Sequence, residues 1–382
     1  MQPKPFKTTR LFCPGPTPVP MEAAIAGLDT QVYHRSPDFS KELSQCHTML
    51  QPFMGTDRQP LILTSSGTGA MEAAVTNLTD VGDEVLIIDG GKFGNRWTKL
   101  CETYQCNTIT LDVPWGSSPD LNLLEETLKK HPHIKAFFIQ GNETSTGVAY
   151  PLREITTIVQ KNSNALIVVD AISALVSHEI QMDKWGIDCL VSGSQKGFGI
   201  PPGLAFIALS QKATENLTNR PKFYFDLRKE AAAQHNAQTA WTPATSLIKG
   251  LRASLSLLNE IGVSECVAHH TNLAQACRKA VKALNFELLA ADHPSNSLTS
   301  IKLPTSIDGV ELLKMIKAKY GAIIAGGQDQ LKGKIVRIAH LGVTDQFNLL
   351  TAISAFEFGL SDLGHIGKLG AGVSAAMEHL KD

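Results

Sequence analysis

Lys196 is the residue whose type and surroundings first suggest chemistry. It lies in the stretch Cys189-Leu-Val-Ser-Gly-Ser-Gln-Lys-Gly-Phe-Gly-Ile-Pro-Pro-Gly203, where an apolar run ends in small residues, a single lysine and then glycines and prolines. The apolar part predicts a buried strand and the rest its exit loop. Burial at this junction would lower the lysine pKa and supply a neutral amine that can attack a carbonyl. The alternative is a lysine that only extends from a strand end into solvent.

Asp170 is a second candidate, because it closes the apolar segment Ala165-Leu-Ile-Val-Val-Asp170. A carboxylate at that position needs a cationic or hydrogen-bond-donating partner to remain charged. It can cap a helix or form a structural ion pair, or it can pair with the nitrogen of a heterocycle.

An anion site is indicated by Ser66-Gly67-Thr68-Gly69, a small-residue turn that opens a predicted helix over residues 70–78. The backbone N–H groups and the helix dipole at such a turn favour a phosphate. The turn is neither the dinucleotide-binding Gly-x-Gly-x-x-Gly pattern, since residue 72 is Glu, nor a P-loop. Phe93, which lies between two glycines, can stack on a planar ring or simply fill the core.

Arg337 lies within an apolar segment, Ile335-Val-Arg-Ile338. A guanidinium there is costly to bury unless it meets a carboxylate, and its fork suits the α-carboxylate of an amino or oxo acid. A structural salt bridge would satisfy it equally well. Together these residues are the parts of a pyridoxal phosphate site, in which Lys196 carries the cofactor and Asp170 keeps its ring nitrogen protonated. The lysine, once displaced by substrate, can then shuttle the substrate's Cα proton.

The candidates follow short apolar segments that alternate with amphipathic ones. Strands are predicted over residues 61–64, 84–89, 108–113, 134–140, 165–170, 189–192 and 204–210, and helices over 70–78, 95–104, 121–131 and 152–161. This alternation predicts βαβ units and a mostly parallel sheet that is covered on both faces. Because ligands bind at the carboxyl ends of such strands, the loops that carry these candidates are expected to meet at one edge.

The chain is expected to divide into three parts. Residues 1–20 are rich in proline and form an extended arm, unable to be a helix or a central strand. Residues 21–261 form a large cofactor-binding domain, with a long helix over 247–261 after an irregular polar segment, 231–245. Residues 262–382 form a smaller α+β domain, with helices over 267–284, 307–319 and 345–360 and strands near 298–303 and within 322–338.

Composition excludes several classes of protein. The net charge is −1, so nothing favours nucleic acid or a membrane surface. The 7 cysteines form no CxxC or metal-binding spacing, which indicates reduced intracellular thiols and no metal site. No run approaches the ~18 apolar residues of a membrane span, and the first residues lack the apolar core of a signal peptide. We therefore expect a cytoplasmic protein.

The chain resembles the class V, fold-type I pyridoxal phosphate aminotransferases of the alanine–glyoxylate, serine–pyruvate and serine–glyoxylate group. The resemblance runs nearly end to end and is carried by an ordered set of motifs: Pro14-Gly-Pro-Thr-Pro-Val-Pro20, Thr144-Ser-Thr-Gly147, Asp170-Ala-Ile-Ser173, Ser192-Gly-Ser-Gln-Lys196 with Pro201-Pro-Gly203, and Val336-Arg-Ile-Ala-His-Leu-Gly342. It implies a fold-type I architecture, with a mostly parallel central sheet flanked by helices and a smaller C-terminal α+β domain.

The resemblance also implies a role for each candidate. Lys196 would form the Schiff base and Asp170 would pair with the pyridine nitrogen. Ile172 and Phe93 would cover opposite faces of the ring, although some relatives carry Trp in place of Phe93. The other roles are a hydrogen bond to the phenolic oxygen or nearby atoms (Thr144), phosphate binding (Thr68, Gly69 and Gln195) and binding of the substrate α-carboxylate (Arg337). The phosphate turn is shorter than in some relatives, which leaves its side-chain donor open.

In this family the partner subunit completes the phosphate site, so the resemblance implies a homodimer. The matching stretch is Gln238-Thr-Ala-Trp-Thr-Pro243, in which Thr242 is the candidate, and the proline-rich arm would lie over the other protomer. The turn at Gly15 and the segment Tyr33-His-Arg35 would lie near the substrate. Arg35 can receive a second carboxylate, as in aspartate or 2-oxoglutarate, or it can be a solvated loop residue.

The function expected from this resemblance is ping-pong transfer of an amino group from a small L-amino acid, with serine or alanine favoured, to glyoxylate or pyruvate. One alternative is an aspartate aminotransferase that uses 2-oxoglutarate. Another is a lyase or cysteine desulfurase, but Cys266 and Cys277 lie in a predicted helix and not in the mobile loop that such an enzyme needs. A subunit of a redox complex is a further alternative, because some relatives carry a soluble-hydrogenase label, but no cysteine cluster fits an iron–sulfur site.

Overall fold

The computed structural model describes residues 8–381, so the first seven residues of the predicted arm lie outside the described part. Its strands are β1 (Arg10–Phe12), β2 (Leu61–Thr64), β3 (Glu84–Asp89), β4 (Asn107–Asp112), β5 (Ala136–Gln140), β6 (Asn142–Glu143), β7 (Val148–Ala149), β8 (Leu166–Asp170), β9 (Cys189–Gly193), β10 (Leu204–Leu209), β11 (Glu287–Leu288), β12 (Leu298–Lys302), β13 (Ala322–Gly326) and β14 (Ile335–Ala339). Its helices are α1 (Met21–Leu28), α2 (Pro37–Met54), α3 (Gly67–Leu78), α4 (Lys92–Thr103), α5 (Leu121–Lys130), α6 (Leu152–Asn162), α7 (Gln211–Glu215), α8 (Leu227–His235), α9 (Thr245–Ile261), α10 (Val263–Ala283), α11 (Gly309–Tyr320), α12 (Gln346–Asp362) and α13 (Ala371–Lys381), with a short 3₁₀ turn at Asp329–Leu331.

The larger sheet has seven strands in the order β2-β10-β9-β8-β5-β3-β4. The pairs β9–β8, β8–β5, β5–β3 and β3–β4 are parallel, while β10 runs antiparallel to both of its neighbours. The sheet is therefore mostly parallel, as the alternating pattern predicted. The predicted strands agree with the observed ones to within two residues at each end.

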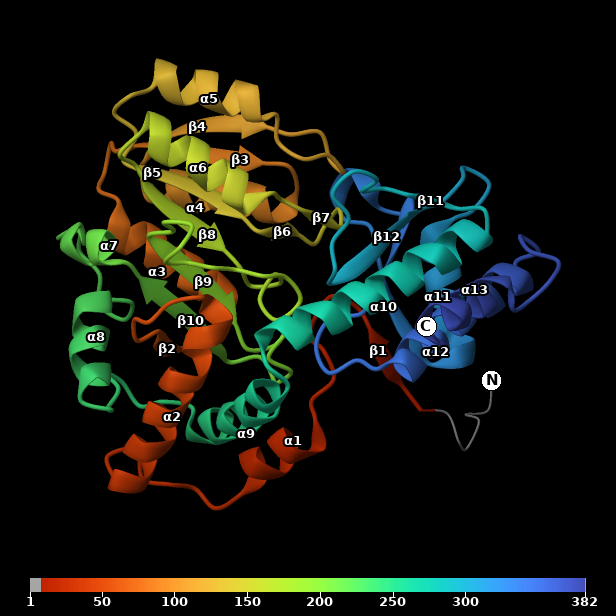
Figure 1. Ribbon diagram of the computed structural model, residues 1–382, viewed down its shortest axis with the longest axis horizontal. Helices are drawn as coiled ribbons and strands as arrows, with labels where there is room; N and C mark the ends of the chain where they lie inside the picture. The colour runs from red at the N-terminus through yellow and green to blue at the C-terminus, as the bar shows by residue number, and fades with distance from the viewer. Residues whose placement is uncertain (1–7, 382) are drawn as a thin grey trace.

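The side chains of each central strand pack into two separate cores, one on each face of the sheet, which explains the strand's continuous run of apolar residues. In β3, for example, Val85 and Ile87 enter one core while Leu86 and Ile88 enter the other. Helices α3 and α4 cover the first face, and α2, α5, α6 and α9 cover the second, so the sheet lies between two helical layers (Figure 1). A strand buried on both faces cannot alternate with polar residues.

The smaller sheet has five strands in the order β1-β13-β14-β12-β11 and packs with α10–α13 around a third core (Figure 1). Its outermost strand, β1, comes from the proline-rich arm and pairs in parallel with β13. The sequence excluded a central strand there but did not reveal this edge strand, because its partner lies near the other end of the chain. Helix α13 was also not predicted.

Helices α3, α4 and α8 differ from the sequence-based expectation in ways that bear on the site or have a clear local cause. Helix α4 begins at Lys92 and not at residue 95, so Phe93 lies in its first turn. Helix α3 likewise begins at Gly67. Helix α8 occupies part of a stretch expected to be irregular, because Asp226 accepts hydrogen bonds from the N–H groups of Arg228 and Lys229 and so caps its start.

No helix within residues 8–381 is both long and apolar enough to cross a membrane. In the same range, no three His, Cys, Asp or Glu side chains form a group that could hold a metal ion.

Candidate active site

Three of the predicted residues meet where the larger sheet faces the smaller one. Asp170 is the last residue of β8, and Lys196 follows the neighbouring parallel strand β9 by three residues. Arg337 lies in β14 of the smaller sheet, and its Nη1 donates to the carbonyl oxygen of Thr144 at 2.6 Å. Parallel strands bring their carboxyl ends to one edge, so Asp170 and Lys196 lie together for the reason the sequence suggested.

The N-terminal arm holds Lys196 in place. The Lys196 Nζ donates to the carbonyl oxygen of Pro14. Thr17 donates through its hydroxyl to the Lys196 carbonyl oxygen at 2.8 Å and through its backbone N–H to Gln195 at 3.1 Å. Gly15 has a φ of +118°, and a Cβ on it would lie 2.5 Å from the Lys196 Nζ. Glycine is therefore needed at residue 15 both for the backbone conformation and for close approach to the lysine.

The Lys196 and Asp170 side chains both titrate near neutrality. Burial lowers the pKa of Lys196 to about 8, although the charge of Asp170 opposes that shift. Burial also raises the pKa of Asp170 to about 7. The Ile172 N–H donates to the Asp170 carboxylate at 2.8 Å, and this hydrogen bond opposes the rise. A positively charged ring nitrogen beside Asp170 would restore its ionised form, and a neutral Lys196 amine is a competent nucleophile.

The N-terminus of α3 offers unpaired hydrogen-bond donors. Ser66 caps the helix by accepting from the Gly69 N–H at 3.4 Å. The N–H groups of Gly67 and Thr68 have no partner among residues 8–381. The Gln195 side chain also has a buried Oε1 atom without a partner, and Ile172 packs directly against Gly67. Residues expected at the phosphate and at the ring face thus lie in one place, and unpaired donors at a helix start suit a phosphate.

Arg337 is 7% exposed and forms no ion pair with a carboxylate in the described part of the chain. Its Nε donates to the carbonyl oxygen of Gly326 at 2.9 Å, in addition to the bond to Thr144. Burial lowers its pKa to about 10, while the negative charge of Glu143 opposes that shift. The structural salt bridge considered from the sequence is therefore not formed here, and the guanidinium can meet a substrate carboxylate.

Glu143 is a buried site residue that sequence reasoning missed. Its carboxylate accepts hydrogen bonds from the N–H groups of Phe93 and Gly94, each at 3.0 Å, and from the Ser145 hydroxyl at 2.5 Å. Burial raises its pKa, and these hydrogen bonds oppose the rise. Glu143 thereby holds the first turn of α4 and places Phe93. A single glutamate within a loop gives no sequence signal for such a role.

Arg35 and Thr242 are not brought to Lys196 within this chain. The Arg35 Nη1 donates to the Gln238 Oε1 at 3.2 Å and to the Thr239 carbonyl oxygen at 3.0 Å. Thr242 is exposed on the same loop. Arg35 therefore lies against the loop that carries Thr242.

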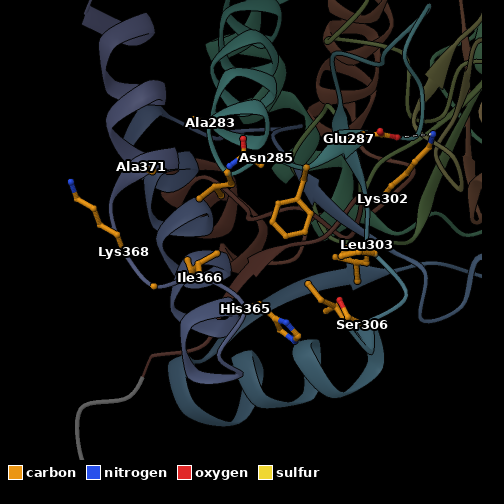
Figure 2. A pocket seen from close by; sticks show the side chains of 15 residues that line it. Ala283, Asn285, Glu287, Lys302, Leu303, Ser306, His365, Ile366, Lys368 and Ala371 are labelled. Carbon is orange, nitrogen blue, oxygen red and sulfur yellow. Dashed lines mark ion pairs between the residues drawn. The ribbon is translucent and has the colours of Figure 1, made fainter.

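A separate hollow of about 770 Å³ lies in the C-terminal part of the chain. Figure 2 shows Lys302, Leu303, Ser306, His365 and Ile366 around it, with an ion pair between Glu287 and Lys302. None of the candidate residues lines this hollow, so it is distinct from the site around Lys196.

The fold and the site define a fold-type I pyridoxal phosphate enzyme. The chain matches the aminotransferase class-V family over residues 23–342 and belongs to that family. It is therefore a transaminase with an α/β fold of fold type I, and pyridoxal phosphate is its cofactor. The free donors of α3, the buried Asp170 and the Lys196 amine fit that cofactor.

Two of the relatives described next are named as aminotransferases of different substrates, and a third carries a hydrogenase-subunit name. The chain is 35% identical over 382 residues to a serine–glyoxylate aminotransferase of Hyphomicrobium methylovorum, covering 97% of this chain and 94% of that one. It is 33% identical over 379 residues to an L-aspartate–glyoxylate aminotransferase of Paracoccus denitrificans, covering 97% and 96%. It is 38% identical over 373 residues to a protein of Synechococcus named soluble hydrogenase, small subunit, covering 96% and 97%.

A solved structure with a similar fold is that of an alanine–glyoxylate aminotransferase from Nostoc. The two chains superpose with a TM-score of 0.87 at 26% identity, covering 94% of this chain and 98% of that one. Cys266 and Cys277, which the desulfurase alternative needs in a mobile loop, are buried on α10. The aminotransferase prediction is confirmed.

Proposed function

We propose that this aminotransferase moves the amino group of a small L-amino acid, serine or alanine, to glyoxylate or pyruvate in a ping-pong reaction. The observation that carries the proposal is the meeting of Lys196, Asp170 and Arg337, whose guanidinium has no carboxylate partner within residues 8–381. When bound, pyridoxal phosphate supplies the carbonyl group that takes up the amino group and the electron sink that stabilises negative charge at the substrate's Cα.

The chain's own residues then have separate tasks. Arg337 binds the substrate α-carboxylate and so turns the Cα–H bond toward Lys196. The Lys196 amine, whose pKa burial lowers to about 8, accepts the Cα proton in its neutral form and returns it as a general acid. The carboxylate of Asp170 holds positive charge on the ring nitrogen. The remaining proposed cofactor contacts are Thr68, Gly69, Gln195, Thr144, Ile172 and Phe93, with Gly15 beside the substrate.

Small substrates are favoured because Arg337 is the one cation that we assign to a substrate carboxylate, and serine and alanine carry a single carboxylate. The names of the serine–glyoxylate relative and the alanine–glyoxylate structure support this choice. An aspartate donor is the second candidate, supported by the name of the L-aspartate–glyoxylate relative. Aspartate carries a second carboxylate, which would require a second cation such as Arg35.

We expect a homodimer in which residues 238–243 of one chain enter the partner's active site. Arg35 would enter that site too, because its side chain donates hydrogen bonds to Gln238 and Thr239. Large apolar side chains are exposed on nearby parts of the chain, including Leu28 at 87% and Phe223 at 72%. Exposed apolar surface of this kind suits a subunit interface. The free cysteines suit a reducing cytoplasm.

We also propose that the chain divides near residues 20 and 261 into an N-terminal arm, a large domain and a small domain.

The test of this function is a half-reaction screen. The cofactor-loaded protein is mixed with each amino acid in turn, and loss of the visible absorbance of the Lys196-linked cofactor reports amino transfer. Serine and alanine should convert it fastest, and Lys196→Ala should not respond. Fast conversion by aspartate alone would instead select the second candidate.

Arg35→Ala separates the two candidates in the dimer. If Arg35 receives a second carboxylate, its loss lowers kcat/KM for aspartate by about tenfold or more, as expected for one charge-assisted hydrogen-bonded pair, and leaves alanine unchanged. Equal effects on aspartate and alanine would remove Arg35 from substrate recognition.

A further inference from the structure

Arg96 connects two parts of the cofactor site and was not among the residues expected from the sequence. It lies one turn after Phe93 on α4, on the same helix face. Its guanidinium lies 4.7 Å from the centroid of the Phe93 ring, a cation–π distance. Its Nη1 donates to the Thr68 hydroxyl oxygen at 3.0 Å. One side chain therefore contacts both the ring-stacking residue and the start of α3.

Arg96 has no acidic partner in residues 8–381, since none of the ion pairs there includes it. Its charge nevertheless reaches the site, because it lowers the pKa of both Asp170 and Lys196. The only polar partner of this partly buried guanidinium in the described residues is a neutral hydroxyl group. Its positive charge would therefore be stabilised by an anion bound nearby. The anion that this family brings to the start of α3 is the cofactor phosphate.

The bond to Thr68 also sets the direction of its hydroxyl group. The Thr68 oxygen accepts from Arg96, so its own hydrogen is left to donate to another acceptor. The backbone N–H groups of Gly67 and Thr68 have no partner in the described residues. The hydroxyl and the two N–H groups together form a set of donors for one anion.

We propose that Arg96 is a positioning residue for the cofactor phosphate, which orients the Thr68 hydroxyl as a donor and adds positive charge at the N-terminus of α3. This inference rests on the placement of the phosphate at Thr68 proposed above. It assigns to α4 two tasks at once, since Phe93 meets the ring while Arg96 acts on the phosphate.

The test compares two probes that differ only in the phosphate. Apoprotein is prepared as wild type, Arg96→Gln, Arg96→Lys and the control Lys99→Gln, an exposed lysine on the same helix. Binding of pyridoxal phosphate and of pyridoxal is measured for each from the visible absorbance, with no amino acid present. Arg96→Gln should weaken pyridoxal phosphate binding by about tenfold to a hundredfold, and pyridoxal binding should not change. Arg96→Lys should recover part of the loss, and Lys99→Gln should match wild type.

A pH titration of the same absorbance gives a second readout. Removal of the Arg96 charge should raise the pKa of the Lys196-linked chromophore, because that cation disfavours a positive charge at Lys196. Equal losses for pyridoxal phosphate and pyridoxal would overturn the proposal, since they would mean that Arg96 only supports the fold. Unchanged binding of both probes would overturn it as well. The amino donor plays no part in this assay, so the half-reaction screen can fail or succeed independently.

Discussion

Gly15→Ala should impair the enzyme through the position of Lys196 and not through loss of folding. A Cβ at residue 15 would lie 2.5 Å from the Lys196 Nζ, 2.6 Å from its Cδ and 2.8 Å from its Cε. All three atoms belong to the free end of a flexible side chain, so the lysine moves and the backbone stays. The same substitution also forces alanine into a φ of +118°, which costs about 1–3 kcal/mol.

Gly82→Ala is a matched control, because Gly82 has a φ of +83° and nothing lies within 4 Å of a Cβ placed there. Both variants should therefore lose a similar amount of stability, measured as the urea midpoint of unfolding. Only Gly15→Ala displaces the lysine amine, and a displacement of about 1 Å at a reacting group can reduce the rate about a hundredfold.

The assay is kcat/KM with alanine and glyoxylate, together with the rate at which the apoprotein takes up pyridoxal phosphate. We expect both to fall strongly in Gly15→Ala and to stay near the wild-type values in Gly82→Ala. If Gly15→Ala turns over as fast as Gly82→Ala, the close packing of Gly15 on Lys196 does not position the amine, and the reasoning is wrong.

Two more predictions concern the charges of the site. Arg337→Ala should lower kcat/KM for alanine about a hundredfold or more, because it removes the guanidinium that meets the α-carboxylate. Arg337→Lys should recover only part of that loss. An equal loss of kcat/KM with an amine that has no carboxylate would contradict this role. The rate of cofactor uptake by the apoprotein should rise with pH and level off above about pH 8, because the neutral form of Lys196 is the nucleophile and its pKa is lowered to about 8. A stopped-flow pH series measures this rate, and a rise centred near the ordinary lysine pKa would show that Lys196 is not desolvated.

The sequence predicted the larger sheet well because its strands carry their own signal. A strand covered on both faces, such as β5 or β8, is apolar at every residue before its last, and its end is marked by a polar residue. The same rule located Asp170, which ends β8, and the loop of Lys196, which follows β9. Pairing between distant segments has no such local mark. The edge strand Arg10–Phe12 therefore escaped prediction, because only contact with β13 makes it a strand.

Helix α4 shows why the rest of the site was hidden. Its N-cap, Gly91, has no side chain to satisfy the first N–H groups, so no capping residue in the sequence marks the start of the helix there. Glu143 supplies the missing acceptor from a different loop, and it can do so because a Cβ on Gly91 would lie 2.5 Å from the Glu143 Cδ. Once the helix starts at Lys92, Phe93 and Arg96 share a face and reach the site together.

The same carboxylate connects the two ends of the site. Glu143 holds Phe93 through α4, and the next residue, Thr144, accepts the hydrogen bond from Arg337. The negative charge of Glu143 also raises the pKa of Arg337 and keeps the guanidinium charged in spite of its burial. The residue proposed to stack on the cofactor ring and the residue proposed to bind the substrate carboxylate therefore depend on one buried acid. We therefore expect a change that moves residues 142–149 to disturb the Phe93 and Arg337 contacts together.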